Sequence, residues 1–168
     1  MKIFYKIFII GTMGSGKTTL ANKISEKLSI KNYSLDDIYY IKKYDKKRSE
    51  IKRKKKLKEL LKKKKWIIEG VFNNWTEDIF KEANLVIWLD LNPHYIVRNL
   101  LKRFFKKEDD KANFQNIKKA SKYALNYRKG SKKFVYHKLM IKKHKVNLVH
   151  IKTRRQLNDF LKTLKRKP

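Results

Sequence analysis

The stretch Gly11-Thr-Met-Gly-Ser-Gly-Lys-Thr18 decides the fold of this 168-residue chain, because it is a complete G-x-x-x-x-G-K-[ST] pattern. The apolar run 3–10 precedes it and predicts a buried strand. Apolar residues at the spacing of a helix face follow it, at Leu20, Ala21, Ile24 and Leu28. A strand, a glycine-rich turn and a helix in this order predict a nucleoside triphosphate site, against the alternative of a glycine-rich turn without function.

The residue types of this stretch suit triphosphate chemistry. Glycines let backbone N–H groups face phosphate oxygens, and the helix that begins near Gly16 adds its positive end. Lys17 would place its charge on the β- and γ-phosphates, and the Thr18 hydroxyl could ligate Mg²⁺. The residues expected to contact the nucleotide are Gly11, Thr12, Met13, Gly14, Ser15, Gly16, Lys17, Thr18 and Thr19.

The composition is strongly basic. There are 46 Lys and Arg residues against 15 Asp and Glu residues, which gives a formal net charge of +31. Such a charge suits a nucleic-acid partner. The other interpretation is a solvated lysine surface that reflects an AT-rich coding sequence, since few of these residues are arginines and Ile, Asn, Tyr and Phe are frequent. Both interpretations stay open at this point.

Length and composition predict one domain over 1–168. The chain has no cysteine, which excludes disulfides and thiolate chemistry. The apolar start ends in the glycine-rich stretch and is far shorter than the ~20 residues of a membrane-spanning helix. We therefore expect a cytoplasmic protein without a signal peptide or membrane segment, and the sequence says nothing of its oligomeric state.

Strand-like and helix-like segments alternate along the chain, which predicts an α/β fold with a mainly parallel, five-stranded sheet. The expected strands are 3–10, 32–35, 66–69, 85–90 and 146–151. Helices are expected after the glycine-rich stretch, at about 49–64, from Asn92, through Phe114 to Leu125 with a stop at Gly130, at about 131–143, and around Leu157 to Leu164. The lysine-rich helix 49–64 carries leucines at helical spacing and is expected to be an ordinary surface helix.

Acidic residues follow three of these strands. Because ligands bind at the carboxyl ends of parallel strands, Asp36, Glu69 and Asp90 could all meet the glycine-rich loop. Glu69 is the strongest candidate to hold Mg²⁺ through water, and Gly70 would clear space for substrate or that water. The alternative for Glu69 is a turn acid satisfied by backbone N–H groups.

Asp36 has two interpretations of equal weight. It could orient an acceptor hydroxyl or remove its proton, and it is a second candidate metal ligand. Alternatively, it caps a short helix over 38–41, with Asp37 as its neighbour. Asp90 precedes Leu91-Asn92-Pro93, so helix capping is its expected role.

Arginine side chains suit a transferred phosphoryl group because their planar fork bridges several oxygens. Arg98, Arg103 and Arg128 are the candidates for this role, and Arg154 could stack on a base after the last strand. The histidines show no zinc-like spacing. Aromatic residues at helical spacing are expected in the core, with base stacking as the alternative; these are Phe104, Phe105, Tyr123 and Tyr127.

With these motifs in view, the chain resembles the adenylate-kinase-like P-loop proteins, and within them the DNA topology modulation (FlaR-like) proteins. The narrower resemblance is carried by Leu35-Asp36-x-Ile38-Tyr39 and by Trp66-Ile-Ile-Glu-Gly-Val71. It implies a parallel sheet between helices, Mg-ATP in the loop, and an acceptor pocket beside it. It also implies that Glu69 holds the metal through water.

The resemblance further implies a lid over the phosphates, here short and around 104–112. Arg103 matches a family Leu-Lys-Arg position whose arginine closes on the phosphates, whereas Asn92 extends the usual Leu-Asp-Leu-Pro and shifts Arg98 by one residue. The main hypothesis is thus a kinase that transfers the γ-phosphoryl group of Mg-ATP to a nucleotide or a small hydroxylated acceptor. The alternative is a nucleic-acid-associated ATP-binding protein with weak or no kinase activity.

Overall fold

The computed structural model describes residues 5–41, 46–70, 74–105 and 114–164, and of residues 74, 103 and 114–116 it describes the backbone alone. Its five strands form one parallel sheet in the order β2-β3-β1-β4-β5. They are β1 (Lys6–Gly11), β2 (Asn32–Ser34), β3 (Trp66–Glu69), β4 (Leu85–Leu89) and β5 (Leu148–Ile151). The predicted fold class is confirmed.

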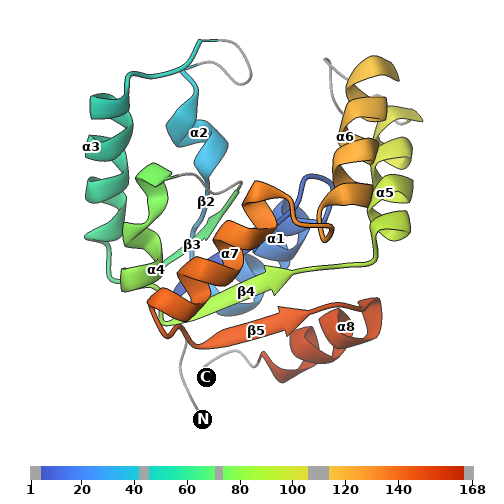
Figure 1. Ribbon diagram of the computed structural model, residues 1–168. Coiled ribbons are helices and arrows are strands. Elements are labelled where there is room, and N and C mark those ends of the chain that lie inside the picture. Colours follow the sequence, from blue (N-terminus) through green and yellow to red (C-terminus); the bar gives the residue numbers. More distant parts are fainter. Residues whose placement is uncertain (1–4, 42–45, 71–73, 106–113, 165–168) are drawn as a thin grey trace.

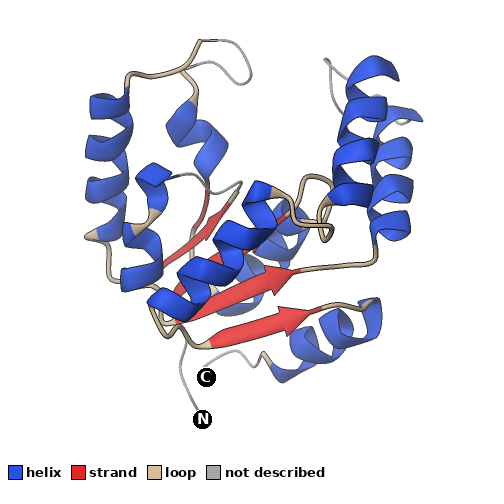
Figure 2. Ribbon diagram, viewed as in Figure 1, coloured by secondary structure: helices blue, strands red, loops and turns tan. Residues whose placement is uncertain are grey.

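Helices cover both faces of the sheet (Figures 1 and 2). The α-helices are α1 (Lys17–Leu28), α2 (Leu35–Tyr39), α3 (Glu50–Leu61), α4 (Asp78–Glu82), α5 (Pro93–Phe105), α6 (Phe114–Asn126), α7 (Lys132–Lys143) and α8 (Arg154–Thr163). A short 3₁₀ helix, η1 (Asn74–Thr76), precedes α4. Every one of these helices is too short or too polar to cross a membrane, within the described parts of the chain.

The alternation of side chains along β1 explains the two hydrophobic layers. Ile7 and Ile9 point to one face and pack with α1 and α8, whereas Phe8 and Ile10 point to the other and pack with α2, α3, α4 and α7. All four side chains are fully buried. Because both faces are covered, the central strands are continuous apolar runs, as expected for a parallel sheet.

The strand register brings the expected site residues to one edge. Ile9 of β1 pairs with Glu69, Glu69 also pairs with Ser34 of β2, and Gly11 pairs with Leu89 of β4. The loop that follows β1 therefore lies between the ends of β3 and β4, next to the residues that follow them. This is the edge at which ligands bind in open α/β sheets.

The sequence interpretation missed η1 and α4 because both are very short. Tertiary packing holds α4: Ile79 and Phe80 are buried, and the Phe80 ring meets the Phe8 ring edge-on at 5.1 Å. The lysine-rich helix is α3, and its leucines face the core as predicted. Helix α6 ends at Asn126, before the predicted stop, and Gly130 lies in the turn that leads to α7.

Candidate active site

The loop between β1 and α1 forms a hollow. Gly16 precedes α1 with a φ of 91°, a left-handed conformation that favours glycine, and a Cβ placed there would meet no atom within 4 Å. Residues 13–19 line a large cavity, while Gly11 and Thr12 lie beneath its surface. The buried Ser15 Oγ has no hydrogen-bond partner within the described part of the chain. Open backbone space beside an unsatisfied hydroxyl fits a bound phosphate group.

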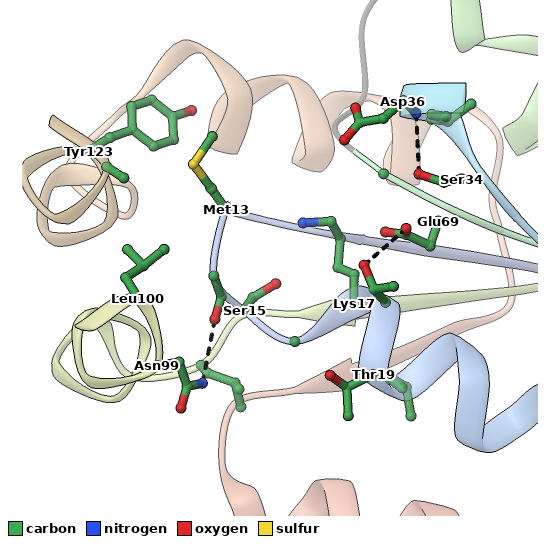
Figure 3. A pocket seen from close by; sticks show the side chains of 18 of the residues that line it. Met13, Ser15, Lys17, Thr19, Ser34, Asp36, Glu69, Asn99, Leu100 and Tyr123 are labelled. Atoms are coloured by element: carbon green, nitrogen blue, oxygen red, sulfur yellow. Dashed lines mark hydrogen bonds between the residues drawn. The ribbon is translucent and has the colours of Figure 1, made fainter. Parts of the chain in front are cut away.

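Lys17 opens α1 and lies across this loop. Its side chain is buried, and its Nζ donates a 2.8 Å hydrogen bond to the carbonyl oxygen of Thr12. Figure 3 shows the amine pointing into the cavity, on the same side as the Glu69 carboxylate. The loop backbone thus holds the charge where β- and γ-phosphates would lie in a P-loop protein.

Thr18 and Glu69 are joined directly. The Thr18 Oγ1 donates a 3.0 Å hydrogen bond to Glu69 Oε1, and Glu69 is buried at the end of β3. A hydroxyl and a carboxylate are oxygen donors of the kind that Mg²⁺ prefers, so these residues fit that ion. Among the described residues no group of three or more His, Cys, Asp or Glu side chains is placed to hold a metal. Mg²⁺ would therefore rely on nucleotide oxygens and water as well.

Asp36 lies across the cavity from the loop (Figure 3). Of the two interpretations of Asp36, helix capping is wrong, because Ser34 is the N-cap of α2 and its Oγ accepts a hydrogen bond from the Asp36 N–H at 3.3 Å. The helix begins at Leu35 rather than near Ile38, which places Asp36 in its first turn. Its carboxylate is therefore not needed by the backbone and faces the cavity.

The predicted role of Gly70, to clear space for substrate or water, is also wrong. Gly70 lines the cavity, with a φ of 153°, but a Cβ there would come within 2.6 Å of the Leu35 Cβ. Glycine is thus needed at this position for the close approach of α2 to the end of β3, rather than to clear space for a ligand.

Asp90 does not cap α5, contrary to the prediction. The Asn92 Oδ1 accepts a hydrogen bond of 2.9 Å from the backbone N–H of His94, in the first turn of α5. Asp90 is buried and instead binds Arg128, whose Nε lies 2.8 Å from Asp90 Oδ1 and whose Nη2 donates to the Asp90 carbonyl oxygen. The other carboxylate oxygen lies 3.1 Å from His150 Nε2. Arg128, predicted as a phosphate ligand, is therefore held in this cluster.

The other arginines predicted to take part in the site do not belong to this cluster. The Arg98 and Arg154 guanidinium groups lie 5.2 Å and 5.3 Å from the centre of the Tyr95 ring. Tyr95 and Arg154 line the cavity, whereas Arg98 does not. Arg103 lies in the last turns of α5, but its side chain is outside the described residues, as is most of the predicted lid at 104–112.

Beneath the cavity lies a buried polar chain. The Trp88 Nε1 donates to Tyr127 Oη at 3.2 Å, and Tyr127 Oη lies 2.5 Å from His137 Nδ1. Burial raises the pKa of Tyr127. Burial, together with the charges of Lys17 and Lys133, lowers the pKa of His137 to about 3. At neutral pH His137 is therefore uncharged, and it shares a hydrogen bond with the Tyr127 hydroxyl inside the core.

The cavity has a volume of about 1830 Å³. Sites for single small molecules usually have about 300–1,000 Å³, so this one has room for two ligands side by side. The wall next to Asp36 is aromatic: Tyr39 and Trp75 stack with ring centres 6.4 Å apart, and the Arg53 guanidinium lies 4.6 Å from the Tyr39 centre.

Sequence reasoning missed several lining residues. Tyr95 had only a weak signal, because it shares a helix face with Arg98, which does not itself line the cavity. Lys133 had none, because one lysine among so many carries no information. Phe104, Phe105 and Tyr123 line the cavity, whereas Tyr127 lies in the core as expected.

Solved structures with the same fold include two shikimate kinases. The enzyme from Acinetobacter baumannii, in complex with shikimate, matches with a TM-score of 0.59 at 18% identity, over 95% of this chain and 89% of that one. The enzyme from Bacteroides thetaiotaomicron matches with a TM-score of 0.58 at 17% identity, over 96% of both chains. At these identities the likeness concerns the fold alone.

Among curated proteins, the uncharacterized protein YqaC of Bacillus subtilis (strain 168) is 33% identical over 84 residues. That match covers 49% of this chain and 47% of the relative, so the chain spans about half the length of the curated relative it matches.

The sequence model of the AAA_18 family, an AAA domain, matches residues 7–120, which include β1 except its first residue, the glycine-rich loop, β2, β3 and β4. The structure places a P-loop at the carboxyl edge of a parallel sheet within this range, as in P-loop kinases. The chain therefore belongs to the AAA_18 family of AAA domains and has a P-loop kinase-like fold.

Proposed function

We propose that this protein is a kinase that transfers the γ-phosphoryl group of Mg-ATP to a hydroxyl group of a nucleotide or small molecule. One observation carries the proposal: Lys17 and the bonded pair Thr18 and Glu69 line the same cavity as Asp36, whose carboxylate is not used by the backbone of the described residues. Phosphoryl transfer needs these two sets of groups, one on the phosphates and one on the nucleophile.

The loop side would bind the donor nucleotide. Backbone N–H groups of residues 13–17 and the Lys17 amine would hold the β- and γ-phosphates, and Thr18 and Glu69 would hold Mg²⁺, with Glu69 acting through water as the resemblance implies. Mg²⁺, when bound, offsets the negative charge of the phosphates. Arg154 and Tyr95 supply a stacking surface for the base. Arg103 is the candidate to neutralise the transferred group, as the resemblance to adenylate-kinase-like proteins implies.

The acceptor side would orient the nucleophile. Asp36 accepts a hydrogen bond from the acceptor hydroxyl and takes its proton as the bond to phosphorus forms. A cavity large enough for two ligands supports this arrangement. The shared fold with shikimate kinases favours a small hydroxylated acceptor, while the resemblance to DNA topology modulation proteins remains a prediction.

The test is transfer of labelled γ-phosphate from Mg-ATP to a panel of nucleoside monophosphates, small hydroxylated metabolites and 5′-hydroxyl oligonucleotides. A labelled product that requires Mg²⁺ and disappears in Asp36→Asn supports the proposal. ATP that binds without transfer to any acceptor would contradict it.

A second candidate rests on the net charge of +31. It is a nucleic-acid-associated ATP-binding protein with weak or no kinase activity. Binding driven by phosphate contacts should weaken with salt at a slope near −0.9 per neutralised phosphate, so a salt titration with duplex and single-stranded DNA tests it. Absent binding at moderate salt removes this candidate.

A further inference from the structure

Lys133 is one of several basic residues outside the phosphate loop that line the cavity. It stands in the first turn of α7 and lines the cavity, half-buried, with its Nζ 5.7 Å from the centre of the Tyr123 ring. No salt bridge joins it to a carboxylate within residues 5–41, 46–70, 74–105 and 114–164. Among the described residues, Lys133 is thus a partly buried cation that forms no direct salt bridge.

Local structure directs this side chain inward. Gly130, with a φ of 88°, turns the chain into α7, and the Ser131 Oγ caps the helix by accepting the Phe134 N–H at 3.3 Å. Lys132, the neighbour of Lys133, is exposed and does not line the cavity. Of two adjacent lysines, the cap therefore places one in water and one in the cavity.

The electrostatics of Lys133 match an anion acceptor site. Burial lowers its pKa, and the negative charge of Asp36 opposes that effect. An arriving anion would supply the stabilisation that the solvent no longer gives, so the ammonium form is favoured when the site is filled. Asp36 is proposed to receive a proton in the reaction and would then lose its negative charge. An anionic acceptor would supply a negative charge beside Lys133 at that point.

We propose that the phosphoryl acceptor is a small hydroxylated anion, whose carboxylate or phosphate group binds Lys133 while its hydroxyl group faces Asp36. This inference rests on the proposed kinase function and names its acceptor class. In the reaction, the acceptor oxygen bonds to the γ-phosphorus, the bond to the β–γ bridging oxygen breaks, and the hydroxyl proton passes to Asp36. The products are the phosphorylated anion and a nucleoside diphosphate.

The aromatic wall limits the shape of this acceptor. Tyr39 and Trp75 line the cavity beside Asp36, and Tyr123 lines it beside Lys133. Apolar ring faces exclude water from the space between the two charged groups, which strengthens both interactions. The acceptor is therefore expected to have a compact carbon frame rather than an extended chain.

The experiment compares matched pairs of acceptors. Labelled Mg-ATP is offered with glycerate, gluconate and quinate, each beside its neutral amide, with glycerol 2-phosphate beside glycerol, and with a 5′-hydroxyl oligonucleotide. We expect transfer to at least one anion and about 10- to 100-fold lower kcat/KM for its neutral partner, the range for loss of a hydrogen bond to a charged group. The carboxylate and phosphate pairs distinguish the two forms of the anion.

Variants assign the preference to Lys133. Lys133→Gln should raise the KM for the anion about 10- to 100-fold and leave ATP affinity and the neutral analogue nearly unchanged, whereas the control Lys132→Gln should change neither. Thermal shifts of the ADP-bound protein with the same anions provide a second readout that does not need turnover.

Two results would overturn the inference without touching the kinase assignment: equal transfer to anionic and neutral partners, or transfer to the oligonucleotide alone. Failure of every anion to be phosphorylated or to shift the melting temperature also overturns it. Failure of the protein to bind ATP overturns the proposed function as well, so the two failures can be told apart.

Discussion

Thr18 and Glu69, 51 residues apart in the chain, share a 3.0 Å hydrogen bond between hydroxyl and carboxylate. The bond exists because β1 and β3 are neighbours in register, so that the residues after β1 face the last residue of β3. The sheet thus assembles the side of the cavity where we propose that Mg²⁺ binds, and the two side chains contribute oxygens of the kind that Mg²⁺ prefers.

Glu69→Gln tests this pair. The amide keeps an oxygen that can accept from Thr18 but loses the negative charge, so we expect a raised Mg²⁺ requirement and about 10- to 100-fold slower γ-phosphoryl transfer. Nucleotide binding measured without Mg²⁺ should hardly change. A Mg²⁺ titration of turnover in both proteins measures the effect, and identical curves would remove Glu69 from the metal site.

Lys17→Ala should abolish triphosphate binding, because the amine held at Thr12 is the charge closest to the expected phosphates. The fold should persist, since the side chain lies at the cavity and outside both hydrophobic layers. Calorimetric titration with ATP and a far-UV circular dichroism melt provide the two readouts. Wild-type turnover in a folded variant would refute the loop assignment.

Arg154→Ala should weaken ATP binding about 3- to 10-fold, because a guanidinium over an aromatic ring or a base contributes about 0.5–1 kcal/mol or more. The affinity for inorganic tripolyphosphate, which has no base, should stay the same. Arg98→Ala is the matched control, since Arg98 contacts the same Tyr95 ring but does not line the cavity. Equal losses for both ligands would place Arg154 on the phosphates instead of the base.

The lowered pKa of His137 predicts how the stability of the protein depends on pH. This pKa falls from 6.5 in the unfolded chain to about 3 in the folded protein. Between these values the unfolded chain binds a proton that the folded protein does not, so the free energy of unfolding decreases as the pH is lowered, by at most about 1.4 kcal/mol per pH unit. Above about pH 6.5 this contribution is constant.

Urea unfolding between pH 4 and pH 7 measures this effect. His137→Gln keeps a hydrogen-bonding side chain near Tyr127. It should reduce the pH dependence of the free energy of unfolding by the amount that corresponds to about one bound proton. The exposed His94→Gln is the control and should leave the slope unchanged. Parallel slopes for wild type and His137→Gln would show that His137 titrates alike in both states.

The fold could be predicted because hydrophobic periodicity and one motif determine it. The strand 66–69 was placed at its observed bounds, and the loop and Glu69 followed from the rule that parallel strands end at one edge. The roles of Asp36, Asp90 and Arg128 depended on contacts between distant residues. Ser34 and Asn92 each lie two residues from the aspartate expected to cap. The choice between such equally suitable neighbouring side chains is not resolved by the sequence alone.

Neither the place of Lys133 in the cavity nor the short helix α4 could be predicted from the sequence, and the reasons differ. A single lysine in a lysine-rich chain has no signal, and α4 depends on the packing of Ile79 and Phe80 more than on its own propensity. The assignment of one domain to the whole chain, and the roles given to each site residue, remain predictions.

The contact of Arg128 with both the carboxylate and the main-chain oxygen of Asp90 has a consequence for the position of Lys133. It fastens the start of the turn into α7 to the residue that follows β4, a few residues before Lys133 in the first turn of that helix. The strand that lies beside the phosphate loop therefore also holds the beginning of α7 in place.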